Sequence, residues 1–157
     1  MSRAGVPSWD PRALYSARTN ARLDQGVLAE RVGISRASVA NYERTDGHAP
    51  SPAVLVSLAR ALDAPPRELL APDARGLAVL RAVAGLSQSE LVERLPTRDL
   101  SVPAYKAIET GRTRRLRESD AEAIAAVLGT DRDTLMREHA YDVDAFTARA
   151  GEGSAAE

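Results

Sequence analysis

The stretch LDQGVLAERVGIS, residues 23–35, decides the fold of this chain. Asp24 is placed to cap a short helix that runs to Val32, because an aspartate side chain accepts the free backbone N–H groups of a first helical turn. Gly33 follows directly, and glycine is the usual residue at a helix C-terminus. Ser35 is placed to cap a second helix, which runs to about Arg44. Two capped helices joined by a tight turn that contains glycine predict a helix-turn-helix.

The same stretch recurs later in the chain. LSQSELVERL, residues 86–95, matches LDQGVLAERV, residues 23–32, and Arg81 falls on Arg18 in the same register. Further on, Glu109 falls on Glu43, after three extra residues in the second copy. The chain is therefore predicted to be a tandem duplication of one small unit.

Both copies predict helices only. Caps and prolines at expected helix starts recur along the chain, and no alternating apolar run is bounded by a hairpin turn. The prediction is an all-α fold of two tandem five-helix domains. The first domain is expected at residues 1–71, a linker at 72–75, the second, divergent domain at 76–138, and a partly disordered acidic tail at 139–157.

The second helix of the motif in the first copy, residues 35–44, is the predicted reading element. A major groove admits one α-helix, and that helix must expose its N-terminal side chains to base edges. Arg36 can pair with guanine, Asn41 can pair with adenine, and small side chains let the backbone approach the bases. Gln25 opens the preceding helix, where its side chain and backbone N–H can meet a phosphate. The DNA contacts predicted for this copy are Gln25, Ser35, Arg36, Ala37, Ser38, Asn41 and Arg44.

Residues 25–43 resemble the helix-turn-helix family of the lambdoid phage repressors and Cro proteins, also called XRE-like. The resemblance rests on the pattern Leu-x-Gln-x-x-Leu-Ala-x-x-Val-Gly-Ile-Ser together with Arg18 and Glu43. It implies a lambda-repressor-like fold and a recognition helix in the major groove. It also implies that Arg18 pairs with Glu43, and that Arg81 pairs with Glu109 in the second copy.

The second copy departs from this pattern at its own reading element. The turn at residues 96–101 lacks the glycine, and the following helix exposes Lys106 as its one strong donor. Base reading is therefore assigned to the first copy. Residues 98–117 nevertheless hold six basic residues against two acidic ones, whereas residues 118–157 hold three basic residues against ten acidic ones. The basic run predicts phosphate contacts, and the acidic end predicts a possible protein partner. The DNA contacts predicted for this copy are Gln88, Lys106, Arg112, Arg114 and Arg115.

Composition excludes further classes of function. The chain has no cysteine and two histidines, His48 and His139, which are expected to be ordinary loop or surface residues. No cofactor, metal site or nucleophile–base constellation is predicted, so an enzyme is not expected. The absence of a long apolar run and of a secretory signal predicts a cytoplasmic protein without a membrane segment.

The leading hypothesis is a sequence-specific transcriptional regulator of repressor type that binds double-stranded DNA as a homodimer. The alternative is a protein-interaction adaptor or an antitoxin-like regulatory subunit with the same fold. A third possibility, in which both copies of one chain bind an asymmetric site, stays open at this point.

Overall fold

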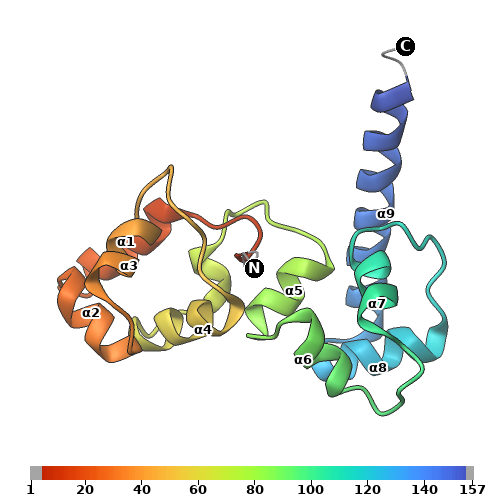
Figure 1. Ribbon diagram of the computed structural model, residues 1–157, viewed down its shortest axis with the longest axis horizontal. Helices are drawn as coiled ribbons and strands as arrows, with labels where there is room; N and C mark the ends of the chain where they lie inside the picture. Colours follow the sequence, from red (N-terminus) through yellow and green to blue (C-terminus); the bar gives the residue numbers. More distant parts are fainter. Residues whose placement is uncertain (1–4, 155–157) are drawn as a thin grey trace. The chain divides into compact units, whose positions relative to one another are not determined.

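The computed structural model describes residues 5–154. The chain folds into two compact units (Figure 1). The first unit holds the residues up to Ala74 together with Ala82–Gly85, and the second holds Arg75–Arg81 and the residues from Leu86 onward. We call them the first and the second domain, and we describe the helix that spans residues 77–83 with the second domain. Across residues 5–154 the only β pairing is an isolated bridge between Trp9 and Leu70, so the predicted all-α fold is confirmed.

The first domain begins each of its four α-helices with a side-chain cap. Asp10, Asp24, Ser35 and Ser51 each accept a backbone N–H from the first turn that follows. The fifth element is a short 3-10 helix, which begins where Pro65 and Pro66 remove two backbone donors. The elements are α1 (Pro11–Asn20), α2 (Gln25–Val32), α3 (Arg36–Tyr42), α4 (Pro52–Ala61) and η1 (Pro66–Leu69). They enclose a core of fully buried side chains, which includes Leu14, Leu28, Val39, Leu55, Leu58 and Leu69.

The segment before α1 anchors the loop that follows α3. The Val6 N–H donates to the Pro50 carbonyl at 2.8 Å, and the Trp9 indole N–H donates to the Tyr42 carbonyl at 2.9 Å. The aromatic rings of Trp9 and Tyr42 meet edge to face with their centroids 6.3 Å apart, an arrangement that aromatic pairs favour. Residues that precede α1, outside the helix-turn-helix motif, therefore hold the C-terminal end of α3 in place.

The second domain repeats the order of helices with a longer last element. Its helices are α5 (Leu77–Val83), α6 (Gln88–Glu93), α7 (Val102–Glu109), α8 (Glu118–Leu128) and α9 (Arg132–Ser154). Ser87 and Glu90 form a reciprocal capping box at the start of α6. Its core includes Leu77, Leu91, Tyr105, Ile124 and Leu135, all fully buried.

Helix α9 packs on the loop that follows α7. His139, predicted as a surface residue, is 3% exposed, and its Nε2 donates to the Thr113 carbonyl at 2.9 Å, so that prediction is wrong. Gly111 has φ +78°, and a Cβ there would lie 2.1 Å from the Asp142 carbonyl oxygen, so only glycine lets α9 come this close. The loop after α7 is thus fixed by α9, as the loop after α3 is fixed by Val6 and Trp9.

Two carboxylates of α9 cap the start of α5. Glu138 Oε2 accepts the Gly76 N–H at 2.6 Å, and Asp142 Oδ2 accepts the Leu77 N–H at 2.8 Å. Arg75 also pairs with Glu138 at 3.0 Å and lies over the Tyr141 ring. Burial, with the negative charges of Glu109 and Glu138 nearby, raises the pKa of Asp142 to about 6.

This raised pKa predicts that Asp142 makes the stability of the second domain depend on pH. A carboxyl group whose pKa is higher in the folded chain stabilises the fold below pH 4 and loses that contribution as the pH rises through 6. Asp142→Asn keeps an acceptor for the Leu77 N–H but cannot ionise. We expect the variant to exceed the wild type by about 1 kcal/mol at pH 7.5, a figure reduced for solvent screening of the part-exposed group. Urea unfolding at pH 7.5 and pH 4.5 measures the difference, and an equal gap at both values would contradict the prediction.

Candidate nucleic-acid interface

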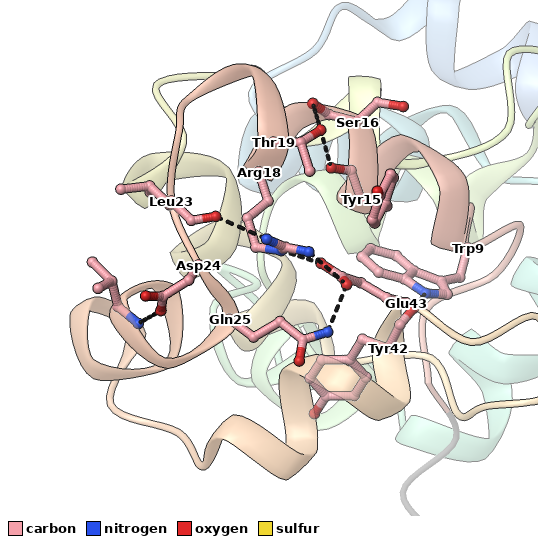
Figure 2. A network of polar contacts seen from close by, with 11 residues as sticks. Trp9, Tyr15, Ser16, Arg18, Thr19, Leu23, Asp24, Gln25, Tyr42 and Glu43 are labelled. Carbon is pink, nitrogen blue, oxygen red and sulfur yellow. Dashed lines mark hydrogen bonds and ion pairs between the residues drawn. The ribbon is translucent and has the colours of Figure 1, made fainter.

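A buried polar network ties three helices of the first domain together (Figure 2). Arg18, on α1 and 8% exposed, makes two bonds to the Glu43 carboxylate, at 2.5 and 3.0 Å, and donates to the Leu23 carbonyl at 2.8 Å. Gln25, at the start of α2, donates its amide N–H to Glu43 at 2.8 Å. A bidentate arginine–carboxylate pair fixes both partners in one geometry. The network therefore fixes the position of the start of α2 relative to the end of α3.

The second domain contains the same network. Arg81 makes two bonds of 2.7 Å to Glu109 and donates to the Leu86 carbonyl at 2.8 Å, while Gln88 donates to Glu109 at 3.1 Å. Burial alone would raise the pKa of Glu109, but the Arg81 contacts outweigh it and leave that pKa lowered. The Tyr105 hydroxyl is buried beside this pair, and burial raises its pKa. Both predicted arginine–glutamate pairs are confirmed.

Helix α3 presents a polar edge to solvent. Ser35, Arg36 and Ala37 are exposed and Ser38 and Asn41 are half-buried, whereas Val39, between them, is fully buried in the core. Ser35 caps the helix by accepting the Ser38 N–H at 3.0 Å. The side chains that the sequence assigned to base reading therefore share the outward side of one short, rigidly held helix.

The start of α2 and the start of α3 meet at an open hollow of about 470 Å³. Gln25 and Gly26 line it from α2, and Arg36 lines it from α3, together with Arg18 and Asp24. In the part of the chain that the structure describes, Arg36 has no ion-pair partner. The N–H groups of the first turn of α2 favour an anion such as a phosphate. The Arg36 guanidinium beside them could donate to a base edge. The hollow is thus chemically suited to the backbone of a nucleic acid.

A family model described as a helix-turn-helix domain matches residues 12–71 and again residues 74–138. The chain belongs to this helix-turn-helix family. The two matches confirm the resemblance to XRE-like proteins and the tandem arrangement of two copies. Neither the curated proteins nor the solved structures contain a match to the chain.

Within the first helix-turn-helix, Arg44 has a partner that sequence reasoning missed. Its guanidinium makes two bonds to the Asp46 carboxylate, at 2.7 and 3.0 Å, and both side chains are well exposed. The Asp46 carboxylate raises the pKa of Arg44. A phosphate at Arg44 would have to displace this carboxylate, so Arg44 is a weaker candidate contact than Arg36. The signal that could have revealed the pair is their spacing of two residues in a turn.

The second helix-turn-helix presents a different surface at the corresponding helix. Pro103, Ala104 and Lys106 are exposed on α7, and Val102 and Ala107 are half-buried. Polar side chains that could read bases are replaced here by small apolar ones, apart from Lys106. The network that positions the helix is kept, but the reading surface is not.

Beyond α7 the second helix-turn-helix carries unpaired positive charge. Arg112, Arg114 and Arg115 are exposed and form no hydrogen bond or ion pair within residues 5–154, whereas Arg117 pairs with Asp120 at 2.8 Å. The loop itself is ordered, because the Thr113 N–H donates to the Ala107 carbonyl at 3.0 Å and His139 holds the Thr113 carbonyl. Three arginines are thus available to an acidic partner.

Residues 5–154 contain neither a metal-ion site nor a membrane-spanning helix. No group of three or more histidine, aspartate or glutamate side chains there is placed to hold a metal ion. No helix in that range has the length and apolar character needed to cross a bilayer.

Proposed function

We propose that this helix-turn-helix protein is a sequence-specific transcriptional regulator of repressor type that reads double-stranded DNA with α3. The family supports DNA binding and regulation in general. The observation that carries the finer proposal is the hollow where Gln25 and Arg36 meet, next to the polar edge of α3. It provides an anion site and a base-reading surface side by side.

The proposed contacts are of two kinds, those to base edges and those to phosphates. Arg36 donates to guanine O6 and N7, and Asn41 pairs with the adenine edge. Ser35, Ala37 and Ser38 keep the helix close to the base edges, and Gln25 contacts a phosphate. The Gln25 amide already donates one N–H to Glu43, which leaves its second N–H and the backbone for the phosphate. Gln88 holds the equivalent position in the second domain. We place the protein in the cytoplasm, where it would repress by occupying its operator.

Selection from a random library of duplexes tests this proposal. We expect one sequence motif to be enriched, with an affinity that falls steeply as salt rises, because phosphate contacts release counterions. Enrichment of no motif at low salt, despite a folded protein, would contradict it.

The same selection tests the second candidate, a protein-interaction adaptor. The acidic surface of α8 and α9 favours this candidate, because a surface rich in carboxylates repels DNA. An adaptor would bind no duplex in the library and would keep its helical fold.

A further inference from the structure

The loop that follows α3 holds an ion pair on the same side of the helix as the proposed base contacts. Glu43 keeps a right-handed helical backbone after the last residue of α3, and the Arg44 N–H donates to the Asn41 carbonyl at 3.2 Å. The spacing of Ala37, Asn41 and Arg44 by four and then three residues therefore continues the outward side of α3. A duplex that reaches α3 would reach Arg44 as well.

A tight turn places the Asp46 carboxylate against this arginine. The Gly47 N–H donates to the Arg44 carbonyl at 3.0 Å, and a Cβ at Gly47 would lie 1.9 Å from the Asn41 carbonyl oxygen, so the turn packs directly on the end of α3. Both carboxylate oxygens of Asp46 accept from the Arg44 guanidinium, at 2.7 and 3.0 Å. Because aspartate has a short side chain and the turn fixes its backbone, this pair costs little conformational freedom.

The Asp46 carboxylate occupies the N–H groups of Arg44 that a phosphate would use. A guanidinium binds a carboxylate and a phosphate through the same fork of donors. The side chains of Arg44 and Asp46 are 64% and 72% exposed, so a phosphate can reach the pair. The hydrogen bond from Arg44 lowers the pKa of Asp46, which keeps its carboxylate ionised at neutral pH. In the free protein, Asp46 therefore takes the place that a phosphate would take.

The second helix-turn-helix lacks this carboxylate. Glu43 falls on Glu109, and the first residue of α4 falls on the first residue of α8 in the same register, so the same number of residues separates each glutamate from the next helix. In that register Asp46 falls on Arg112, which is exposed and has no hydrogen bond or ion pair within residues 5–154. The copy that keeps a polar reading surface thus has an acid where the other copy has a free cation.

We propose that Asp46 is a built-in competitor of the DNA backbone, which occupies Arg44 and limits the affinity of the first helix-turn-helix for any duplex. This role rests on the proposed function, because it requires α3 to approach DNA. Arg44 contacts a phosphate only after it leaves Asp46, so binding exchanges an ion pair for a phosphate contact. The exchange carries no sequence information, because phosphates are alike in every duplex. Asp46 therefore lowers the affinity for operator and unrelated DNA by the same factor.

Asp46→Asn is the variant that tests this competition. Asparagine is nearly the size of aspartate and suits a turn, but it cannot form an ion pair with Arg44. We expect D46N to bind the selected duplex and a scrambled duplex more tightly by the same factor, about threefold to tenfold at low salt. The slope of log affinity against log salt should steepen by about 0.9, as one added phosphate contact requires. Competition binding over a series of salt concentrations measures both quantities.

Asp63→Asn is the matched control for the change in net charge. Asp63 is also an exposed aspartate of the first domain, its side chain has no partner among the described residues, and asparagine tolerates its φ of +51°. We expect D63N to change affinity by less than about twofold, because an exposed charge away from the duplex is screened by salt. A gain from D46N no larger than that from D63N would overturn the competitor role.

Replacing Arg44 tests whether Asp46 acts through that arginine. The gain from D46N is expected to be larger in the wild-type background than in the R44Q background, because only arginine can exchange the carboxylate for a phosphate. The variants R44Q and R44Q/D46N complete this comparison. Equal gains in the two backgrounds would mean that Asp46 only repels DNA as a negative charge, and the competitor role would be wrong.

The outcomes separate this role from the proposed function. If selection enriches a motif but D46N gains no affinity, α3 reads bases and the competitor role is wrong. If D46N gains affinity for every duplex through Arg44 while no motif is enriched, the competitor role holds and sequence-specific reading fails. If neither the wild type nor D46N binds any duplex at low salt, both are wrong.

Discussion

Replacing Arg81 by methionine is expected to lower the free energy of unfolding of the second domain by about 3 to 5 kcal/mol. The substitution leaves Glu109 buried and without its bidentate partner, and an uncompensated buried charge costs this much. The Glu109 side chain is 6% exposed and the Arg81 side chain 12%, so water cannot replace the lost contacts. Urea unfolding followed by far-UV circular dichroism measures the loss.

A double variant separates the charge effect from simple packing loss. Arg81→Met with Glu109→Met removes both charges and is expected to recover most of the stability, since apolar residues of similar size often replace a buried ion pair without loss. The corresponding Arg18→Met lies in the first domain, where Trp9 reports unfolding by its fluorescence because its indole is bonded to Tyr42. If Arg81→Met costs less than 1 kcal/mol, Arg81 and Glu109 do not hold the helices together as described.

Arg36→Ala is expected to reduce affinity for the selected duplex by about 5-fold to 150-fold. This range corresponds to the 1 to 3 kcal/mol by which one bidentate base contact discriminates against a wrong base. Affinity for a scrambled duplex should change much less, so the ratio of the two affinities should collapse toward one. Competition binding at one fixed salt concentration measures both values.

Arg60→Ala is the matched control for Arg36→Ala. Arg60 is also an exposed arginine of the first domain and lies in the last turn of α4, so its removal changes net charge equally. It should leave the preference between the two duplexes intact. If Arg36→Ala and Arg60→Ala behave alike, Arg36 contributes only net charge and the assignment of base reading to it is wrong.

Most of the fold could be read from the sequence, because its signals are local. Asp24, Gly33 and Ser35 mark the ends of α2 and α3 within a few residues of one another, and the structure has these helices there. Because the sequence is duplicated, the corresponding helices can be predicted in the second domain as well. Arg18 and Glu43 could be paired in advance because the family resemblance relates residues far apart in the chain.

The candidate site was only partly predictable. The outward positions on α3 followed from helical periodicity around Val39, and they lie on the exposed side. The hollow joining Gln25 to Arg36 depends on how two helix starts approach each other, which no local pattern contains. The pairing of Arg44 with Asp46 likewise depends on the conformation of the loop after α3.

By itself the sequence determined the helical class, the tandem repeat, the capped motif and which side chains lie on the exposed side of α3. Each of these rests on contacts within one turn or on a repeat visible in the chain. The tertiary structure alone decided that His139 is buried, that the carboxylates of α9 cap α5, and that α9 continues to Ser154 past a composition typical of a polar tail. The physical reason is that burial and capping between distant helices depend on a three-dimensional approach, here α9 against Gly111, which residue order does not reveal.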